Sequence, residues 1–302
     1  MLQPALTRLE QGFQSSRLTQ IFAPLLAQKN IECWVKRDDL IHPVISGNKW
    51  RKLKYSLDHA LQLHSHTVLS MGGAYSNHLH ALAYACQQLG LNSMGFIRGE
   101  KPKRINPTLA DLQQWGMVLQ YISRAEYRTL RQYKDHQALP GIKTGEYWLP
   151  EGGATELALK GLAEMVTELD TEFDVICVPC GTGTTLAGII NACPENTEVY
   201  GFSALKGAGF LQEDVKKLLN TSRLNTPRWN IQLDYHFGGF AKCNPALLLF
   251  MQDFANRHAI TLEQVYTAKM FYGLFDLIAQ DHFRPGQKIL AIHTGGLQGN
   301  RA

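Results

Sequence analysis

Residues 175–188 read "VICVPCGTGTTLAG" and place a strand, a loop and a helix in direct succession. The first six residues form an apolar run that is typical of a buried strand. Glycine and threonine fill positions 181–185, and a helical apolar pattern follows them directly. A strand that passes through a glycine loop into a helix is typical of a parallel α/β sheet.

The glycine loop of this stretch has the chemistry of an anion site. Gly181 and Gly183 allow backbone amides to turn outward, and Thr182, Thr184 and Thr185 add hydroxyl donors. The positive end of the following helix points toward the same place. A phosphate group fits such a loop, while a tight turn without a ligand is the alternative that the loop alone leaves open.

Nucleotide motifs are incomplete at this loop. Position 186 is Leu where the dinucleotide pattern needs Gly, and no lysine follows as in a nucleoside triphosphate site. A nicotinamide-dependent dehydrogenase is therefore a weaker alternative, and it predicts no lysine-bound chromophore.

The same alternation of strands and helices continues along most of the chain. Strands are predicted at 66–72, 92–97, 117–122, 173–179, 197–204 and 288–296, and helices at 76–90, 155–169, 185–193 and 244–258. This order predicts an α/β fold in which helices cover both faces of parallel sheets. Ligands of such sheets bind beyond the carboxyl ends of the strands.

The composition is that of an ordinary soluble globular protein. The 302 residues are 45% hydrophobic and 19% charged, and the formal net charge is +4. The basic residues are scattered, so no nucleic-acid partner is expected. No window approaches the ~18 apolar residues of a membrane span, and the first residues lack a secretory pattern, so we expect a cytoplasmic protein that does not bind a membrane. The six cysteines are expected to be free thiols, and no metal site is expected.

A second strand, glycine and helix succession lies at 69–85, "LSMGGAYSNHLHALAYA". Ser76 or Asn77 is placed to cap the helix, and capping alone explains both residue types. The functional alternative is that the helix amides hold a carboxylate while Ser76 acts as an acid or base beside it.

Residues 46–55, "SGNKWRKLKY", contain Lys49, Arg51, Lys52 and Lys54. Four cations on a surface helix are by default solvated charge. The residue pattern alone does not decide whether Lys49 is a reagent instead.

Seven motifs together resemble the aminocyclopropanecarboxylate deaminase and D-cysteine desulfhydrase family of pyridoxal-phosphate enzymes. In chain order they are "WVKRDDL", "SGNKWRKLKY", "SMGGAYSNH", "PEGGATELALKG", "CGTGTTLAG", "VYTAKMFYGLFDLI" and "IHTGGLQG". The resemblance implies the tryptophan-synthase β-like fold, with two domains that are each three-layer αβα with a parallel twisted sheet. It also implies a large cofactor-binding domain at 1–47 and 149–302, a small inserted domain at 48–148, and a homodimer that acts on a small amino acid.

The resemblance implies a role for each matching residue. Lys49 matches the lysine that forms the Schiff base with pyridoxal phosphate, and it is also the expected base. Lys52, one helical turn later, is expected to reach the phosphate. Asn77 is expected to bond the ring hydroxyl, and Tyr266 to lie against the ring and the substrate.

The remaining implied roles concern the phosphate and the substrate. The phosphate loop of the family corresponds to Gly181, Thr182, Gly183, Thr184 and Thr185. The segment Tyr75, Ser76, Asn77 and His78 is expected to face the substrate, with Ser76 and Tyr266 as candidates for proton transfer.

Two threonines favour one activity over the other. In the cyclopropane deaminases a glutamate follows the tyrosine and a leucine precedes the last Gly-Gly, whereas this chain has Thr267 and Thr294. A hydroxyl stabilises a protonated pyridine nitrogen less than a carboxylate does. Ring opening of a cyclopropane needs the deeper electron sink, so the prediction is a D-cysteine desulfhydrase. The alternatives are a cyclopropane deaminase and a cofactor-binding protein without elimination activity.

Two positions depart from the family pattern. Tyr75 stands where glutamine is usual, and Trp50 stands where a small threonine is common. We expect both near the pocket, where their bulk would alter the substrate. Arg51 and Lys54 are expected to remain solvated charges.

Overall fold

The structure is a computed structural model that describes residues 1–219 and 225–301. It divides into two compact units. Unit 1 contains Met1–Gln14, Ile41–Gly161 and the C-terminal Arg301, and unit 2 contains Ser15–Leu40 and Leu162–Asn300.

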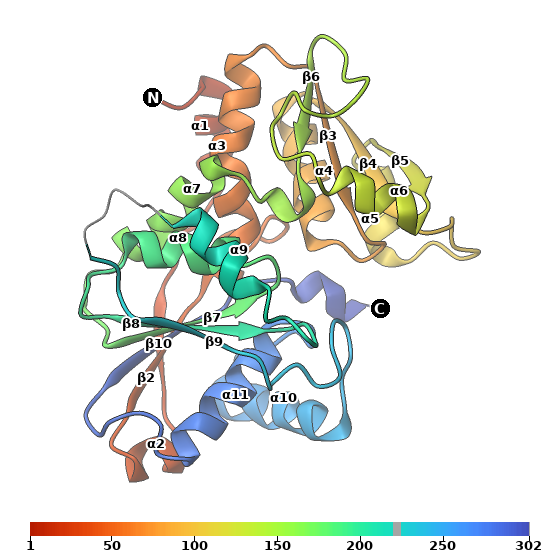
Figure 1. Cartoon of the computed structure of the whole chain (residues 1–302). Helices are drawn as coiled ribbons and strands as arrows, with labels where there is room; N and C mark the ends of the chain where they lie inside the picture. Colours follow the sequence, from red (N-terminus) through yellow and green to blue (C-terminus); the bar gives the residue numbers. More distant parts are fainter. Residues whose placement is uncertain (220–224, 302) are drawn as a thin grey trace. The chain divides into compact units, whose positions relative to one another are not determined.

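Unit 2 is built on a sheet that has six strands in the described part of the chain, in the order β1-β2-β10-β7-β8-β9 (Figure 1). The strands are β1 (Leu18–Ile21), β2 (Glu32–Lys36), β7 (Val175–Cys180), β8 (Glu198–Ser203), β9 (Trp229–Gln232) and β10 (Lys288–Ile292). All neighbours pair in parallel except β1, which runs antiparallel to β2. No strand was predicted at this edge. Residues 22–31 between the two strands are too few for the usual parallel crossover.

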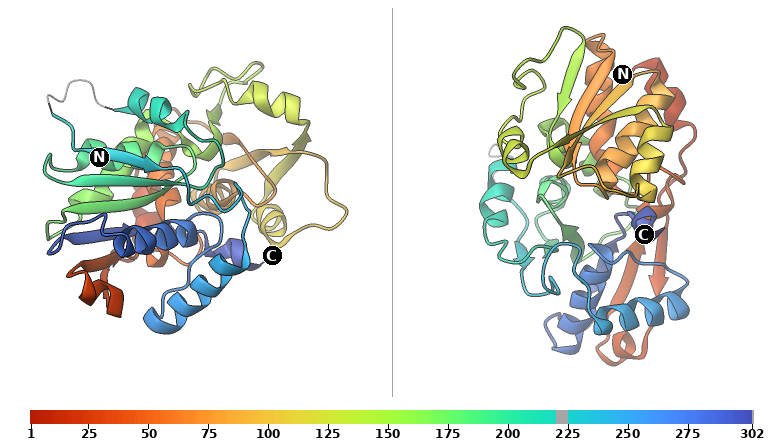
Figure 2. Two further views of the ribbon diagram at one scale, coloured as in Figure 1. Left: turned by 60° about the horizontal axis from the view of Figure 1, so that its bottom comes forward. Right: turned by 90° about the vertical axis from the view of Figure 1, so that its right-hand side faces the viewer.

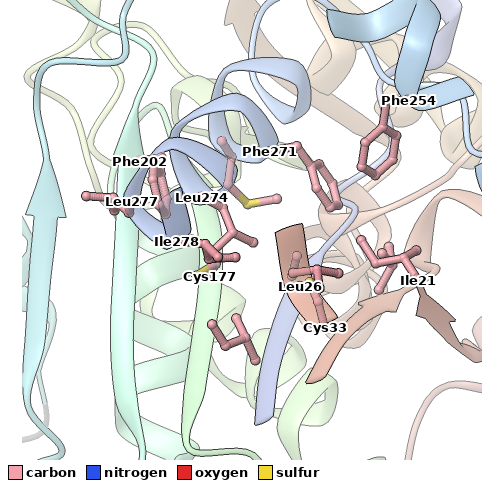
Figure 3. Close-up of a cluster of buried hydrophobic side chains, with 14 of the residues drawn as sticks. Ile21, Leu26, Cys33, Cys177, Phe202, Phe254, Phe271, Leu274, Leu277 and Ile278 are labelled. Atoms are coloured by element: carbon pink, nitrogen blue, oxygen red, sulfur yellow. The ribbon is translucent and has the colours of Figure 1, made fainter. Parts of the chain in front are cut away.

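Helices cover both faces of this sheet. They are α2 (Pro24–Gln28), α8 (Thr184–Ala192), α9 (Leu211–Leu218), α10 (Pro245–His258) and α11 (Thr267–Ala279). Helices α8 and α9 lie on one face, and α10 and α11 lie on the other (Figure 1, Figure 2). The α11 side chains Phe271, Leu274 and Ile278 repeat at helical spacing and pack toward Cys33 and Cys177 of the strands (Figure 3). This core fixes the N-terminus of α11 at one edge of the sheet.

Unit 1 is built on a four-stranded parallel sheet in the order β5-β4-β3-β6. The strands are β3 (Thr67–Gly72), β4 (Asn92–Arg98), β5 (Met117–Ile122) and β6 (Glu146–Leu149). The helices are α1 (Pro4–Glu10), α3 (Asn48–Gln62), α4 (Asn77–Leu89), α5 (Pro107–Gln114) and α6 (Arg124–Leu130). Helix α7 (Glu156–Thr167) contains the border between the units.

The strands of unit 1 alternate between two cores. Val68 packs with residues of α3, α4 and α5, whereas its neighbour Leu69 packs with Tyr127 of α6 on the opposite face. Successive side chains of a strand point to opposite faces, so the sheet has a helical layer on each side. The predicted α/β fold with three-layer αβα domains and parallel sheets is confirmed.

Every predicted strand and helix overlaps an observed one, and β1, β2, β6 and β9 were not predicted. The compact units also divide the chain at other residues than the predicted domains do. Residues 1–14 belong to unit 1 because Leu6 of α1 is buried in the same core as Leu53 and Leu79. The main borders follow Leu40 and Gly161 instead of residues 47 and 148.

All six cysteines are free, as predicted, and five of them are buried. Within residues 1–219 and 225–301, no helix has both the length and the apolar character that crossing a membrane requires.

Candidate active site

Lys49 lies in the first turn of α3 and is half-buried. Its helix is preceded by Gly47, whose φ of 66° and ψ of −153° are accessible essentially only to glycine. The Lys49 Nζ atom donates to Oδ1 of Asn48 at 2.9 Å. The sequence Gly-Asn-Lys thus bends the chain into the helix and orients the amine at its start.

The other members of the basic run have different surroundings. Arg51 and Lys52 are buried, so the prediction that Arg51 is solvated is wrong. Lys54 forms an ion pair with Glu10 at 2.8 Å. Trp50 is buried and stacks on Phe13 with ring centroids 4.4 Å apart. Its bulk fills the core of unit 1, so its size is explained by packing.

The β3 strand leads into the N-terminus of α4 through Gly72 and Gly73. Ser76 is the N-cap of α4, and its Oγ accepts the backbone N–H of Leu79 at 3.2 Å. A side chain at Gly72 would collide with Ser76, because an added Cβ would lie 2.5 Å from Ser76 Oγ. The capping interpretation is therefore confirmed, and it leaves the Ser76 hydroxyl proton available as a donor. Asn77 opens the helix, and Tyr75 is 57% exposed.

His78 is held by a chain of hydrogen bonds inside unit 1. Ser70 Oγ donates to the carbonyl oxygen of Leu149 at 2.7 Å and lies 2.8 Å from His78 Nε2. Since the hydroxyl has one proton, Nε2 must donate to Ser70, and Nδ1 is then an acceptor. Among the described residues this buried Nδ1 has no hydrogen-bond partner. It faces Gly153, where an added Cβ would lie 3.5 Å from Nδ1 and 3.4 Å from Lys52 Cβ.

We expect His78→Gln to make stability less sensitive to acid. Burial, together with the nearby charges of Lys49 and Lys52, lowers the pKa of His78 from 6.5 to about 3. Between these two pKa values His78 is protonated in the unfolded chain but stays neutral in the folded protein. Falling pH therefore costs about 1.4 kcal/mol of stability per pH unit from this group.

Urea unfolding of H78Q at a series of pH values between about 4 and 6.5 measures this contribution. Glutamine keeps an N–H for Ser70 but takes up no proton, so the unfolding free energy should decline less steeply than in the parent protein. His64→Gln, at an exposed position, controls for the substitution itself. Equal slopes for H78Q and the parent would contradict the prediction.

The glycine loop of unit 2 has the predicted form. Strand β7 ends at Cys180, and α8 begins at Thr184 with Gly183 as its N-cap at a φ of 75°. Thr184 and Thr185 are buried, and the hydroxyls of Thr182 and Thr184 are 3.0 Å apart. An added Cβ on Gly183 would lie 2.7 Å from Val215 Cγ2, so glycine is required for space as well as for conformation.

Tyr266 lies directly against this loop. An added Cβ on Gly181 would be 3.1 Å from Tyr266 Cε1 and 3.2 Å from its hydroxyl. The tyrosine ring also contacts Phe240, with centroids 5.9 Å apart and an interplanar angle of 71°. The structure therefore brings together two predicted site segments that lie far apart in the sequence.

Thr267 and Thr294 differ in what their hydroxyls can do. Thr267 is fully buried, and its Oγ1 accepts the N–H of Glu263 at 2.9 Å and donates to the Glu263 carbonyl at 3.3 Å. Its hydroxyl is therefore used within the protein. Thr294 follows β10, which pairs in parallel with β7, so Thr294 and the glycine loop share the carboxyl edge of one sheet.

His293 holds the backbone beside Thr294. Its Nε2 donates to the carbonyl of Thr261 at 2.8 Å, and its Nδ1 accepts the N–H of Gly295 at 3.2 Å. Burial lowers the pKa of His293, which favours the neutral ring that this pattern requires.

The family of the chain follows from comparison with known proteins. A family model described as "Pyridoxal-phosphate dependent enzyme" matches residues 17–295. The chain belongs to this family. The predicted cofactor and the prediction of an enzyme are thereby confirmed, and the nicotinamide alternative is wrong.

Two curated relatives extend the similarity over most of this pyridoxal-phosphate enzyme. A "Putative 1-aminocyclopropane-1-carboxylate deaminase" of Thermotoga maritima is 34% identical over 92% of this chain and 93% of the relative. A "Bifunctional D-cysteine desulfhydrase/1-aminocyclopropane-1-carboxylate deaminase, mitochondrial" of Arabidopsis thaliana is 32% identical over 89% of this chain and 73% of the relative. A solved "ACC deaminase homologue" superposes with a TM-score of 0.79 at 25% identity, covering 99% of this chain and 97% of the homologue.

The residues present fit pyridoxal phosphate. The N-terminus of α8 is bare of side chains at Gly181 and Gly183, which leaves its amides for a phosphate. Lys49 supplies the amine that a carbonyl carbon requires. In unit 1, the buried Nδ1 atom of His78 is an acceptor that could take a hydrogen bond from a bound group.

Sequence reasoning missed three residues that shape these segments, namely Ser70, Glu263 and His293. Ser70 lies in the middle of the apolar strand β3 and His293 directly follows β10. A lone polar residue in a buried position was the available signal at both. Glu263 gave no such signal, since an acidic residue before a helix is common.

Proposed function

We propose that this chain is a pyridoxal-phosphate-dependent lyase that converts D-cysteine, or a related small β-substituted amino acid, to pyruvate, ammonia and sulfide. The observation that carries the proposal is the absence of a carboxylate at the two positions assigned to the pyridine nitrogen, 267 and 294. The Thr267 hydroxyl is bonded to the backbone of Glu263. The Thr294 hydroxyl is therefore the one that would bond the ring nitrogen. A hydroxyl there suits the release of a thiolate, which takes its electrons away.

The cofactor would be held through several groups. Lys49 would bind its carbonyl carbon, the loop at 181–185 and Lys52 its phosphate, and Asn77 its ring hydroxyl. Tyr266 would lie against its ring. When bound, the cofactor withdraws electrons from the Cα atom of the attached amino acid and makes its proton acidic.

This chain's own residues supply binding and proton transfer. The amides at the N-terminus of α4, including the backbone N–H of His78, would bind the substrate carboxylate together with Ser76 and Asn77. The amine of Lys49 removes the α-proton. The oxygen of the Ser76 hydroxyl already accepts the Leu79 N–H. The hydroxyl would donate its proton on the face of the substrate opposite Lys49.

A substrate panel tests the proposal. Purified protein loaded with pyridoxal phosphate is assayed for pyruvate and sulfide from D-cysteine, L-cysteine and β-chloro-D-alanine, and for 2-oxobutyrate from the cyclopropane acid. We expect D-cysteine to exceed the cyclopropane acid in kcat/KM by about 100-fold or more.

The other outcomes are informative. Preferred turnover of the cyclopropane acid would establish the second candidate, a deaminase, which is what the Thermotoga maritima relative is named. If the protein retains the lysine-bound chromophore but converts none of these compounds, it is a cofactor-binding protein without elimination activity.

We further propose a homodimer in the cytoplasm. Six free cysteines in one chain suit a reducing compartment. The dimer rests on the family resemblance of the seven motifs.

A further inference from the structure

Glu263 is a fully enclosed carboxylate next to the site segment that contains Tyr266. It is 2% exposed. Its Oε1 accepts the N–H groups of Tyr266 and Thr267, each at 2.6 Å, and its Oε2 accepts the N–H of Val265 at 2.7 Å. Both carboxylate oxygens are thus used by the backbone where α11 begins.

A buried carboxylate is costly unless hydrogen bonds and charges compensate it. Burial raises the pKa of Glu263, and the three backbone N–H groups and the charge of Lys269 oppose that rise. The positive N-terminal end of α11 also favours a negative charge at this place. A neutral capping residue would satisfy helix amides at less cost, so the carboxylate needs a further reason.

The backbone that Glu263 holds is unusual. Tyr266, the N-cap of α11, has a φ of −124° and a ψ of −67°, outside the helical and extended regions. This conformation carries the ring to Gly181. Without the Glu263 bonds the N–H groups of residues 265–267 would lose the acceptor that keeps this turn in place.

Lys269, in the first turn of α11, holds the segment that carries the aromatic neighbour of Tyr266. It is buried, and its Nζ atom donates to the carbonyl oxygens of His236 at 2.9 Å and Gly239 at 2.7 Å. The next residue, Phe240, is the ring that meets Tyr266 edge to face. Two buried opposite charges, Glu263 before α11 and Lys269 within it, therefore fix Tyr266 and its aromatic neighbour.

We propose that Glu263 is a positioning residue that acts through Tyr266, setting the tyrosine ring against the phosphate loop. The proposal rests on the role given to Tyr266 under the proposed function. It assigns a catalytic consequence to a carboxylate that touches neither substrate nor cofactor.

Glu263→Gln is the first test, because glutamine keeps the size but turns an N–H₂ group toward one of the backbone N–H donors. We expect kcat for D-cysteine to fall by about 10- to 100-fold, because small misplacements at a site have effects of this size. KM should change much less. In a Tyr266→Ala background, which removes the ring, the same substitution should lower kcat by less than about threefold, because residues that act as a unit are not additive.

A second readout needs neither cofactor nor turnover. The chain has 11 tyrosines, and protein labelled with 3-fluorotyrosine gives fluorine NMR signals from which Y266F removes that of Tyr266. In cofactor-free E263Q the Tyr266 signal should move and broaden while the others keep their positions. Glu213→Gln, at an exposed residue of α9 paired with Lys216, is the matched control and should leave every signal and the activity unchanged.

Glu263→Asp replaces E263Q if the latter does not fold, since it keeps the charge but withdraws the carboxylate by one methylene, and it should also shift the Tyr266 signal. An unchanged Tyr266 signal in a folded variant overturns the proposal, as does an equal loss of kcat in the Y266A background. Inactivity on the substrate panel with a shifted Tyr266 signal would count against the proposed function only.

Discussion

Lys49→Ala is expected to abolish the lysine-bound visible absorbance of the purified enzyme and to lower kcat for D-cysteine by about 10⁴-fold or more. The amine has two roles in the proposed reaction, as the covalent anchor of the cofactor and as the base that takes the α-proton. Loss of a nucleophile that is also the base has effects of this order in other enzymes. Lys49 lies in the first turn of α3, after the glycine-specific turn at Gly47.

Absorbance spectra with added pyridoxal phosphate and the pyruvate assay measure the two roles separately. Lys54→Ala is the control, because Lys54 belongs to the same basic run but forms an ion pair with Glu10. We expect K54A to retain the chromophore and nearly full activity. A visible lysine-bound chromophore that persists in K49A would show that another residue is the anchor.

The order of the elements could be predicted because local signals agreed with the fold. The 175–188 stretch places a strand, a glycine loop and a helix where β7, the loop and α8 are found. Edge strands were missed for a physical reason. β1 and β9 have four residues each and side chains that are mostly half-buried, so their apolar patterns are weak.

The sequence predicts the site as a set of segments, but it does not predict the packing around them. Trp50 was expected near the pocket, yet it stacks on Phe13, a residue of the first segment of the chain. Arg51 was expected in solvent and is buried. Such outcomes depend on which distant residues meet, and a local sequence pattern holds no information on that.

Thr267 shows the same limit at a single hydroxyl. The motif drew attention to the position after Tyr266, but the hydroxyl there is bonded to the backbone of Glu263. The residue type indicated what Thr267 is able to bond, and the fold determined which partner it has. Glu263 itself entered the argument only once its three backbone contacts were visible.

Gly161→Ala is expected to be the most damaging conservative substitution in unit 1. An added Cβ at Gly161 in α7 would lie 1.9 Å from the carbonyl oxygen and 2.9 Å from the carbonyl carbon of Arg51. These are backbone atoms of α3, which cannot rotate away as a side chain would. The helix must therefore move, and Lys49 is only two residues from the collision.

Helix propensity acts in the opposite direction, since alanine is favoured over glycine inside a helix by about 1 kcal/mol. The overlap should outweigh it, because overpacking in a close-packed core costs about 1–3 kcal/mol and more where the backbone must shift. We therefore expect the free energy of unfolding to fall by about 3 kcal/mol, together with weaker binding of pyridoxal phosphate. Urea unfolding and cofactor titration measure the two effects.

Gly12→Ala is the matched control, because its Cβ would meet only the carbonyl oxygen of Leu9 at an ordinary 3.4 Å. If G161A is as stable as the parent, α3 and α7 do not approach as closely as the structure shows, and the close packing beside Lys49 is not what holds the reactive lysine in place.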